Sequence, residues 1–288
     1  MATAGGALPA RTGTILYSAQ SVQGTPVTPA TACGICSFTQ VKEEGLTGIH
    51  TLGQAAVLSV REGRSLARLT LNITAVQNET LIARALRSSG VVPWTTFGGG
   101  YVDDAGTVLA WQMQDAKINT IDVSLDAAGV LSATLEIIGG LITSLTTGMA
   151  AAHLTDTVHS GFDGVLTKGG ASWESIRFRL NVNNNITPQY VIPGAAPSSF
   201  KRGFAYLPEG DQDVSGEITR FAASAVDLQA ASMSDFAISL AMTDIGASGN
   251  VSTFAVAGAK FGAESWSVSP GGFHEFTTPF IAKTATIS

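Results

Sequence analysis

The stretch NTIDVSLDAAGVLSATLEII, residues 119–138, decides the fold class. Apolar and polar residues alternate on both sides of a turn at residues 126–129. The apolar residues of this pattern are Ile121, Val123, Leu125, Leu131, Ala133, Leu135 and Ile137. A period of two is typical of a strand with one face on a core and the other in water. The stretch therefore predicts a β-hairpin with one apolar face and one polar face.

The same alternation recurs elsewhere in the chain. Residues 68–74 alternate around Leu69, Leu71 and Ile73, and residues 175–182 alternate in the same way. Only two segments favour a helix. Asn78 is a suitable N-cap for a short helix that Gly90 would end, and Ser224 opens a second capping pattern. The sequence thus predicts a mainly β protein with two short helices.

An internal repeat organises the chain. Ala116-Lys117-Ile118 returns as Ala259-Lys260-Phe261. We call the shift in residue number that carries Ala116 to Ala259 the repeat shift. The repeat shift also relates the hairpin residues that follow in the two halves. Nearly the same shift separates the two predicted helix caps. A repeated order of strand, helix and hairpin indicates duplication of one unit. We therefore predict two domains, residues 1–150 and 151–288, each about the size of a small domain with its own core.

The composition favours a protein whose surface is covered by other subunits. Charged residues make up 13% of the 288 residues, against about 25% in typical soluble proteins. The cores of protein interfaces are depleted in such residues. A compositionally biased genome is the alternative explanation. The net charge of −6 argues against a protein that grips nucleic acid, but an acidic wall would still let a polyanion slide past.

No pattern in the chain predicts catalysis, a cofactor or a metal site. The nucleophile elbow, the phosphate-binding loop and the zinc-protease motif are all missing. Cys33 and Cys36 form a lone pair with too few neighbouring ligands for zinc. His153 and His159 do not have a familiar ligand spacing. Residues 1–11 lack the apolar core of an export signal, and no stretch is long and apolar enough to span a membrane. We expect a cytosolic protein that is not an enzyme.

Three stretches together resemble the duplicated tail tube proteins of long-tailed, siphovirus-like bacteriophages. The first is QGTPVTP at residues 23–29. The second begins with DAKI at 115–118, continues through GVLSAT at 129–134 and ends with IG at 138–139. The third comprises FDGV at 162–165, residues 176–186 with their triple asparagine, RG at 202–203 and VSGEI at 214–218. They span most of the chain in the order typical of that family, although they are turn and strand patterns without a catalytic signature.

The resemblance implies a fold and an assembly. The fold would be mainly β, with two tandem tail-tube-like β-sandwich or barrel units, each with one short flanking α-helix. The chain's main partner would be itself: trimeric rings of pseudo-sixfold symmetry, stacked into a hollow tube. DNA would pass through the tube without specific binding. The further partners would be the tape measure, terminator and tip proteins of a virion tail assembled in the host cytoplasm, with no membrane and no cofactor.

Two groups of residues are candidates for function in such a tube. Asp122, Asp126 and Glu136 on the polar face of the hairpin would repeat around a ring as an electronegative lumen wall. The alternative is that this face is an outer, solvated surface. Long connections at residues 41–62 and 187–212 would bridge stacked rings. The alternative interpretation is that both connections are disordered surface loops. Their charged candidate residues are Lys42, Glu43, Glu44, Lys201 and Arg202.

Two other functions compete with a tail tube. A tail-tip or capsid decoration protein could use a similar sandwich, but it would stay a small closed oligomer. A carbohydrate-binding adhesive module would expose aromatic residues in a groove, and aromatic residues are only 7% here. Self-assembly into cylinders distinguishes the tube protein from both alternatives.

Overall fold

The computed structural model describes residues 14–50, 57–75, 79–87, 90–102, 108–140, 142–145, 158–191, 204–221, 235–243, 251–268 and 274–287. Within these ranges the chain forms seventeen strands, one short α-helix and one 3-10 helix. Every pairing between the strands is antiparallel. The predicted mainly β class is therefore confirmed.

The first half of the chain contains β1 (Thr14–Ala19), β2 (Thr31–Ala32), β3 (Ile35–His50), β4 (Val57–Ala75), α1 (Glu79–Ala83), β5 (Thr95–Val102), β6 (Val108–Asp126), β7 (Ser132–Gly139) and β8 (Ile142–Leu145). The second half contains η1 (Gly161–Asp163), β9 (Gly164–Lys168), β10 (Ala171–Ser172), β11 (Arg177–Asn183), β12 (Asp213–Phe221), β13 (Phe236–Thr243), β14 (Val251–Phe261), β15 (Ser265–Val268), β16 (His274–Ala282) and β17 (Thr284–Ile287).

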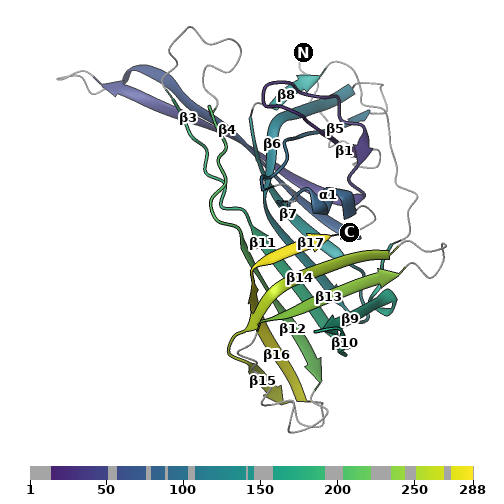
Figure 1. Cartoon of the computed structure of the whole chain (residues 1–288). Helices are drawn as coiled ribbons and strands as arrows, with labels where there is room; N and C mark the ends of the chain where they lie inside the picture. Colours follow the sequence, from purple (N-terminus) through teal and green to yellow (C-terminus); the bar gives the residue numbers. More distant parts are fainter. Residues whose placement is uncertain are drawn as a thin grey trace.

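A central sheet runs through both halves of the molecule (Figure 1). Its strand order is β3-β4-β7-β6-β11-β12-β16-β15. The two halves meet inside this sheet, where β6 pairs with β11 and Val123 lies opposite Leu180. Alternation of side chains along every strand gives the sheet a buried apolar face and a polar face.

A smaller flanking sheet covers the apolar face in each half. In the first half it consists of β2, β1, β5, the beginning of β6 and β8. In the second half it consists of β10, β9, β13, β14 and β17. The long strands β6 and β14 each belong to both sheets. They contain positive φ angles of 52° at Asp115 and 63° at Gly258. The repeat shift relates these two residues, and each lies at the point where its strand passes from one sheet to the other.

The two halves repeat one pairing pattern, register by register. Lys117 lies opposite Ile138 between β6 and β7, and Lys260 lies opposite Ile281 between β14 and β16. The repeat shift carries each residue of the first pair onto its counterpart in the second. The same shift relates the pairs of β6 with β8 to those of β14 with β17. The hydrogen-bonding register therefore carries the repeat that the sequence indicates.

Most of the buried apolar side chains form one continuous cluster drawn from both halves. It includes Leu69, Phe97 and Ile121 of the first half together with Phe178 and Phe254 of the second. Separate cores were expected, but the direct pairing of β6 with β11 leaves no gap between them. The predicted domain boundary at residues 150 and 151 lies outside the described residues.

The first predicted helix is present as α1, followed by a turn. Leu81, Ile82, Ala85 and Leu86, in α1 and the turn after it, are all buried. Asn78, its predicted cap, and the second predicted helix from Ser224 lie outside the described residues. The hairpin turn is also confirmed, because the Gly129 N–H donates to the Asp126 carbonyl at 2.9 Å.

Each half sends out one arm between its first two central strands. The first arm, residues 44–50 and 57–65, is the part of the β3–β4 hairpin that extends beyond the central sheet (Figure 1). The second arm, residues 184–191 and 204–212, lies between β11 and β12. The prediction of a loop at residues 41–62 is wrong where these residues are described. β3 and β4 pair there residue by residue, with irregular register at Glu44/Leu46 and Ile49/His50.

Candidate functional site

The three candidate acidic residues lie together on the polar face of the central sheet. They line a hollow of about 530 Å³ over β6, β7, β11 and β12. Its lining residues are Thr120, Asp122, Ser124, Asp126, Thr134, Glu136, Arg177, Arg179, Asn181 and Glu217. All of them project from strands that belong to one sheet, so the sheet sets their spacing. The hollow therefore spans the junction of the two halves.

Two of the three acidic residues have arginine partners from the second half. The Arg179 guanidinium donates to both carboxylate oxygens of Asp122, from Nε at 3.0 Å and from Nη2 at 2.7 Å. Arg177 Nε donates to Asp126 Oδ1 at 2.5 Å. These bonds raise the pKa of both guanidiniums above the ordinary arginine value. Both oxygens of the Asp122 carboxylate therefore accept hydrogen bonds from one guanidinium across the junction of β6 with β11.

The hollow nevertheless keeps a negative excess. Four carboxylates and two guanidiniums line it, which leaves two uncompensated negative charges. The sequence shows the alternation that places Arg177 and Arg179 on a polar face, but the prediction of an electronegative wall did not include them. Only the pairing of β6 with β11 brings those arginines next to the candidate carboxylates.

Both edges of the central sheet are unpaired within the described part of the chain. β3 pairs only with β4, and β15 pairs only with β16 among the described strands. The β3 edge also exposes apolar side chains. Phe38 is 43% exposed, whereas its counterpart in the second half, Phe178, is 2% exposed because β11 lies between β6 and β12. Unpaired edges of this kind are places where another strand can add.

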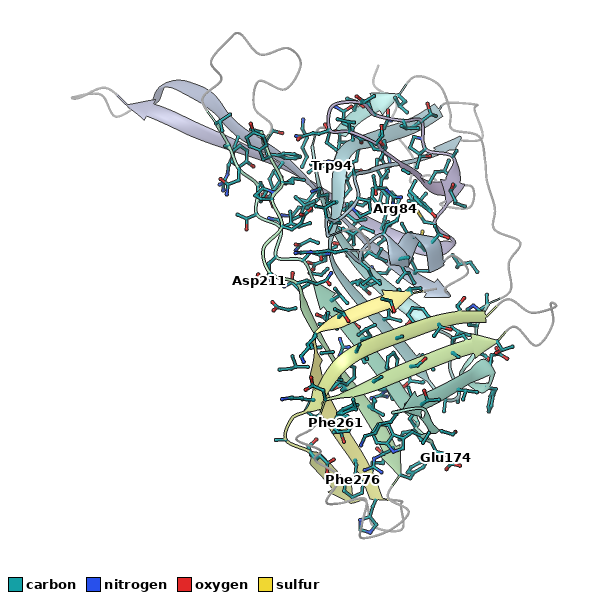
Figure 2. All side chains as sticks on the ribbon, viewed as in Figure 1. Arg84, Trp94, Glu174, Asp211, Phe261 and Phe276 are labelled. Carbon is teal, nitrogen blue, oxygen red and sulfur yellow. The ribbon has the colours of Figure 1, made fainter. Side chains whose placement is uncertain are left out.

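The second arm binds tightly to the first half of its own chain. Asn184 is fully buried, and its Nδ2 donates to the carbonyls of Ala85 at 2.8 Å and Ile118 at 3.0 Å. Arg87 Nη2 donates to the Gly210 carbonyl at 2.5 Å. Figure 2 shows the side chains of this region, with Trp94 labelled on the first half and Asp211 on the second arm.

A buried ion pair and a small apolar cluster lie at the centre of this contact. Lys117 forms an ion pair with Glu209, and the two side chains are 8% and 11% exposed. The Lys117 ammonium also lies 4.3 Å from the centre of the Trp94 ring. The apolar cluster beside it contains Leu66, Ile138, Ile186, Phe204 and Leu207. The arm thus covers residues on the otherwise polar face of the sheet.

The remaining candidate residues are only partly described. Lys42 and Glu43 lie in β3, where Arg68 Nε donates to Glu43 Oε1 at 2.7 Å. Glu44 begins the first arm, and its side chain is outside the described part. Lys201 and Arg202 lie between the two described segments of the second arm, so the structure does not describe them.

The cysteines are free thiols with poor reactivity. Burial, with a contribution from Cys36, raises the pKa of Cys33 well above its ordinary value. Burial raises the pKa of Cys36 to about 11. Since the thiolate is the reactive form, both side chains stay protonated near neutral pH.

Within the described ranges, no group of three or more His, Cys, Asp or Glu side chains could hold a metal ion. Within the same ranges, no helix has the length and apolar character needed to cross a bilayer.

No protein-family model matches this chain, and no curated protein matches it either.

Proposed function

We propose that this chain is the structural subunit of a phage tail tube. Copies would join edge to edge into rings, and the rings would stack into a hollow cylinder through which DNA passes. The observation that carries the proposal is the junction of the two halves. β6 and β11 join two units of equivalent pairing within one chain. The equivalent outer strands, β15 and β3, each pair on one side only among the described strands.

Repetition of that junction between copies would generate a closed ring. A contact between two different surfaces of identical copies builds a ring when its rotation closes. The chain already contains one such contact between two like units, so a ring of three chains would have six units. Pairing around the ring would also remove both exposed edges, which otherwise invite disordered aggregation.

The polar face of the central sheet is the proposed lumen surface. Its hollow carries an excess of two negative charges, and a ring repeats that charge around the bore. Phosphate would be repelled weakly and evenly, so DNA would slide without binding. Replacing Asp122 and Glu136 by Lys should therefore slow genome ejection from phage carrying the variant, and unchanged ejection kinetics would contradict the lumen assignment.

Electron microscopy of the purified protein tests the proposal as a whole. Negative staining should show rings or cylinders of uniform bore. Small closed oligomers would favour a decoration or tip protein, and dispersed monomers at high concentration would refute self-assembly.

Two substitutions at one position of the β3 edge, one disruptive and one harmless, test whether that edge is used in assembly. Asn184 N donates to the Asn119 carbonyl and Ala127 N donates to the Ile176 carbonyl, so alternate residues of β11 face β6. Leu180 is one of the β11 residues whose backbone N–H and C=O face β6. Gln40 is its counterpart in β3, so the backbone N–H of Gln40 should face outward from the sheet edge. Gln40→Pro removes one outward N–H that pairing between copies needs. It should prevent assembly, whereas Gln40→Ala should assemble normally.

A further inference from the structure

The two arms are counterparts in register as well as in position. In the first arm, Thr47 lies opposite Arg61 and Ile49 lies opposite Ser59. In the second arm, Thr187 N donates to the Pro208 carbonyl, and Gln189 bridges to Tyr206. The sequences of β3 and β11 can be aligned with Phe38 on Phe178, and those of β4 and β12 with Leu71 on Ile218. In this alignment, the two pairs of the first arm correspond to the two pairs of the second arm. The central strands themselves support this alignment, because Phe38 lies opposite Leu71 as Phe178 lies opposite Ile218.

The arms also share the residues that make the second arm bind. The alignment of β4 with β12 places Val60, Glu62 and Gly63 of the first arm on Leu207, Glu209 and Gly210 of the second. The alignment of β3 with β11 places Leu46-Thr47 on Ile186-Thr187. In the second arm, Glu209 binds Lys117, while Ile186 and Leu207 cover Ile138. The first arm therefore carries the same set of apolar and acidic residues.

The surface that would receive the first arm is open in the single chain. Ile138 is 2% exposed under the second arm, whereas its counterpart Ile281 is 72% exposed. Lys117 has a side chain 8% exposed, whereas that of its counterpart Lys260 is 58% exposed. Lys260 lies one residue before Phe261, which marks this region in Figure 2. Removing the second arm from the first half would expose Ile138 and Lys117 in the same way. The surface around Ile281 and Lys260 therefore resembles the docking surface of the second arm without its arm.

The open surface has a charge that suits an acidic residue. Lys260 Nζ lies 3.4 Å from Asp235 Oδ1, and Lys283 forms an ion pair with the other oxygen of the same carboxylate. These hydrogen bonds hold the pKa of Asp235 below its ordinary value. Two ammonium groups therefore share one carboxylate, which leaves one positive charge for an incoming glutamate.

We propose that the first arm of one copy docks on the second half of a neighbouring copy, around Lys260 and Ile281, as the second arm docks on the first half within each chain. Glu62 takes the place of Glu209 and binds Lys260, and Leu46 and Val60 cover Ile281. The same equivalence sets the register of the strands beside this contact. Ser265 of β15 lies opposite Val41 of β3 in the neighbour, as Asp122 lies opposite Asn181. This proposal rests on the self-assembly proposed above, and it adds the docking site and the register.

Disulfide trapping tests the register. In a Val41→Cys/Ser265→Cys variant, the two introduced thiols would face each other across an antiparallel pair, within the Cα separation that a disulfide allows. Oxidation should convert most of the protein into covalent multimers on a non-reducing gel. A Ser37→Cys/Ser265→Cys variant, which is out of register, should remain monomeric on the same gel. The native cysteines contribute little, because their thiols stay protonated near neutral pH.

A charge exchange tests the docking site. Lys260→Glu should lower the assembled fraction at least about tenfold, since two like charges would face each other. Adding Glu62→Lys should restore it. Thermal melting of the dispersed variants checks that the fold is kept, which we expect because Lys260 is exposed.

The outcomes separate this proposal from the proposed function. Cylinders that form normally, without the Val41–Ser265 cross-link and without response to Lys260→Glu, would overturn the docking site and leave self-assembly standing. Wild-type protein that forms no rings or cylinders, together with a Val41→Cys/Ser265→Cys variant that forms no cross-linked multimers, would overturn both. A cross-link in register, together with rescue by the charge exchange, would establish the proposal.

Discussion

At one position of the central sheet, the first half has Leu69 opposite Ile137, and the second half has Gly216 opposite Phe280. The register is the same, but the volume is divided differently. A Cβ on Gly216 would lie 2.4 Å from the Phe280 ring and 2.2 Å from the Arg179 carbonyl. Phe280 therefore occupies the space that a side chain at 216 would fill. The two halves keep one pairing pattern while their packing changes by compensation.

The surfaces of the two halves differ in a second way. The first half is covered by an arm of its own chain, whereas the equivalent surface of the second half is open. The difference in core packing at Gly216 is compensated within the chain by Phe280. The difference in surface coverage has no such compensation within the described part of the chain. This contrast between the two halves leads to four predictions.

The largest expected effect is the difference in stability between variants at Lys117 and at its counterpart Lys260. Lys117→Met leaves Glu209 buried without its partner, which should lower the free energy of unfolding by about 3–5 kcal/mol. Lys260→Met removes an exposed charge and should change the stability of the dispersed chain by less than about 0.5 kcal/mol. Urea unfolding of both variants measures the difference. Equal effects would show that the two lysines are not in the contrasting environments described.

The second prediction concerns the exchanged packing at Gly216. Gly216→Leu should destabilise the chain by about 3 kcal/mol through overpacking. Adding Phe280→Ile, which recreates the residue types of the first half, should recover part of this loss. The recovery should be incomplete, because the Arg179 carbonyl also lies close to the new side chain. A double-mutant cycle measures the coupling, and strict additivity of the two changes would contradict compensation.

The third prediction concerns the bends of the two long strands. Asp115 tolerates its positive φ while accepting a hydrogen bond from Gly24 N at 2.6 Å and another from the Gln20 side chain. Its counterpart Gly258 has no side chain. Gly258→Ala should therefore cost about 1–2 kcal/mol, and Gly258→Asn should cost less, because asparagine adopts this conformation more readily. Thermal melting compares them, and an Asn variant weaker than the Ala variant would count against the backbone explanation.

The smallest effect is expected on the polar face of the central sheet. Asp122 and Arg179 have side chains 27% and 50% exposed, so solvent screens their attraction. A double-mutant cycle with Asp122→Asn and Arg179→Gln should give a coupling below about 1 kcal/mol, smaller still at high salt. A coupling above about 2 kcal/mol, unchanged by salt, would mean that this pair determines the junction of the halves.

Much of the central sheet could be predicted from the sequence because its alternation is strong. Residues 119–138 and 68–74 have a clear period of two, and the repeat shift that carries Ala116 to Ala259 appears in both the sequence and the pairing. The first arm could not be predicted as a pair of strands. Gly45, Gly48 and the neighbouring charges interrupt the alternation in β3, while pairing with β4 maintains the strand.

The candidate site could be predicted only in part. The polar face followed from alternation, which placed Asp122, Asp126 and Glu136 together. Their pairing with Arg177 and Arg179 depends on the contact of β6 with β11, and no local pattern specifies which distant strand pairs with which. The ion pair of Lys117 with Glu209 was missed for the same reason, although both residues have counterparts at Lys260 and Glu62 that the repeat could have revealed.

The most direct test of the central claim is the structure of the assembled protein by electron cryo-microscopy. The proposed assembly requires one closed sheet in which β15 of each copy lies beside β3 of the next, with Ser265 opposite Val41 and two equivalent units per chain. An assembly in which copies touch through other surfaces, with both strand edges still unpaired, would contradict it.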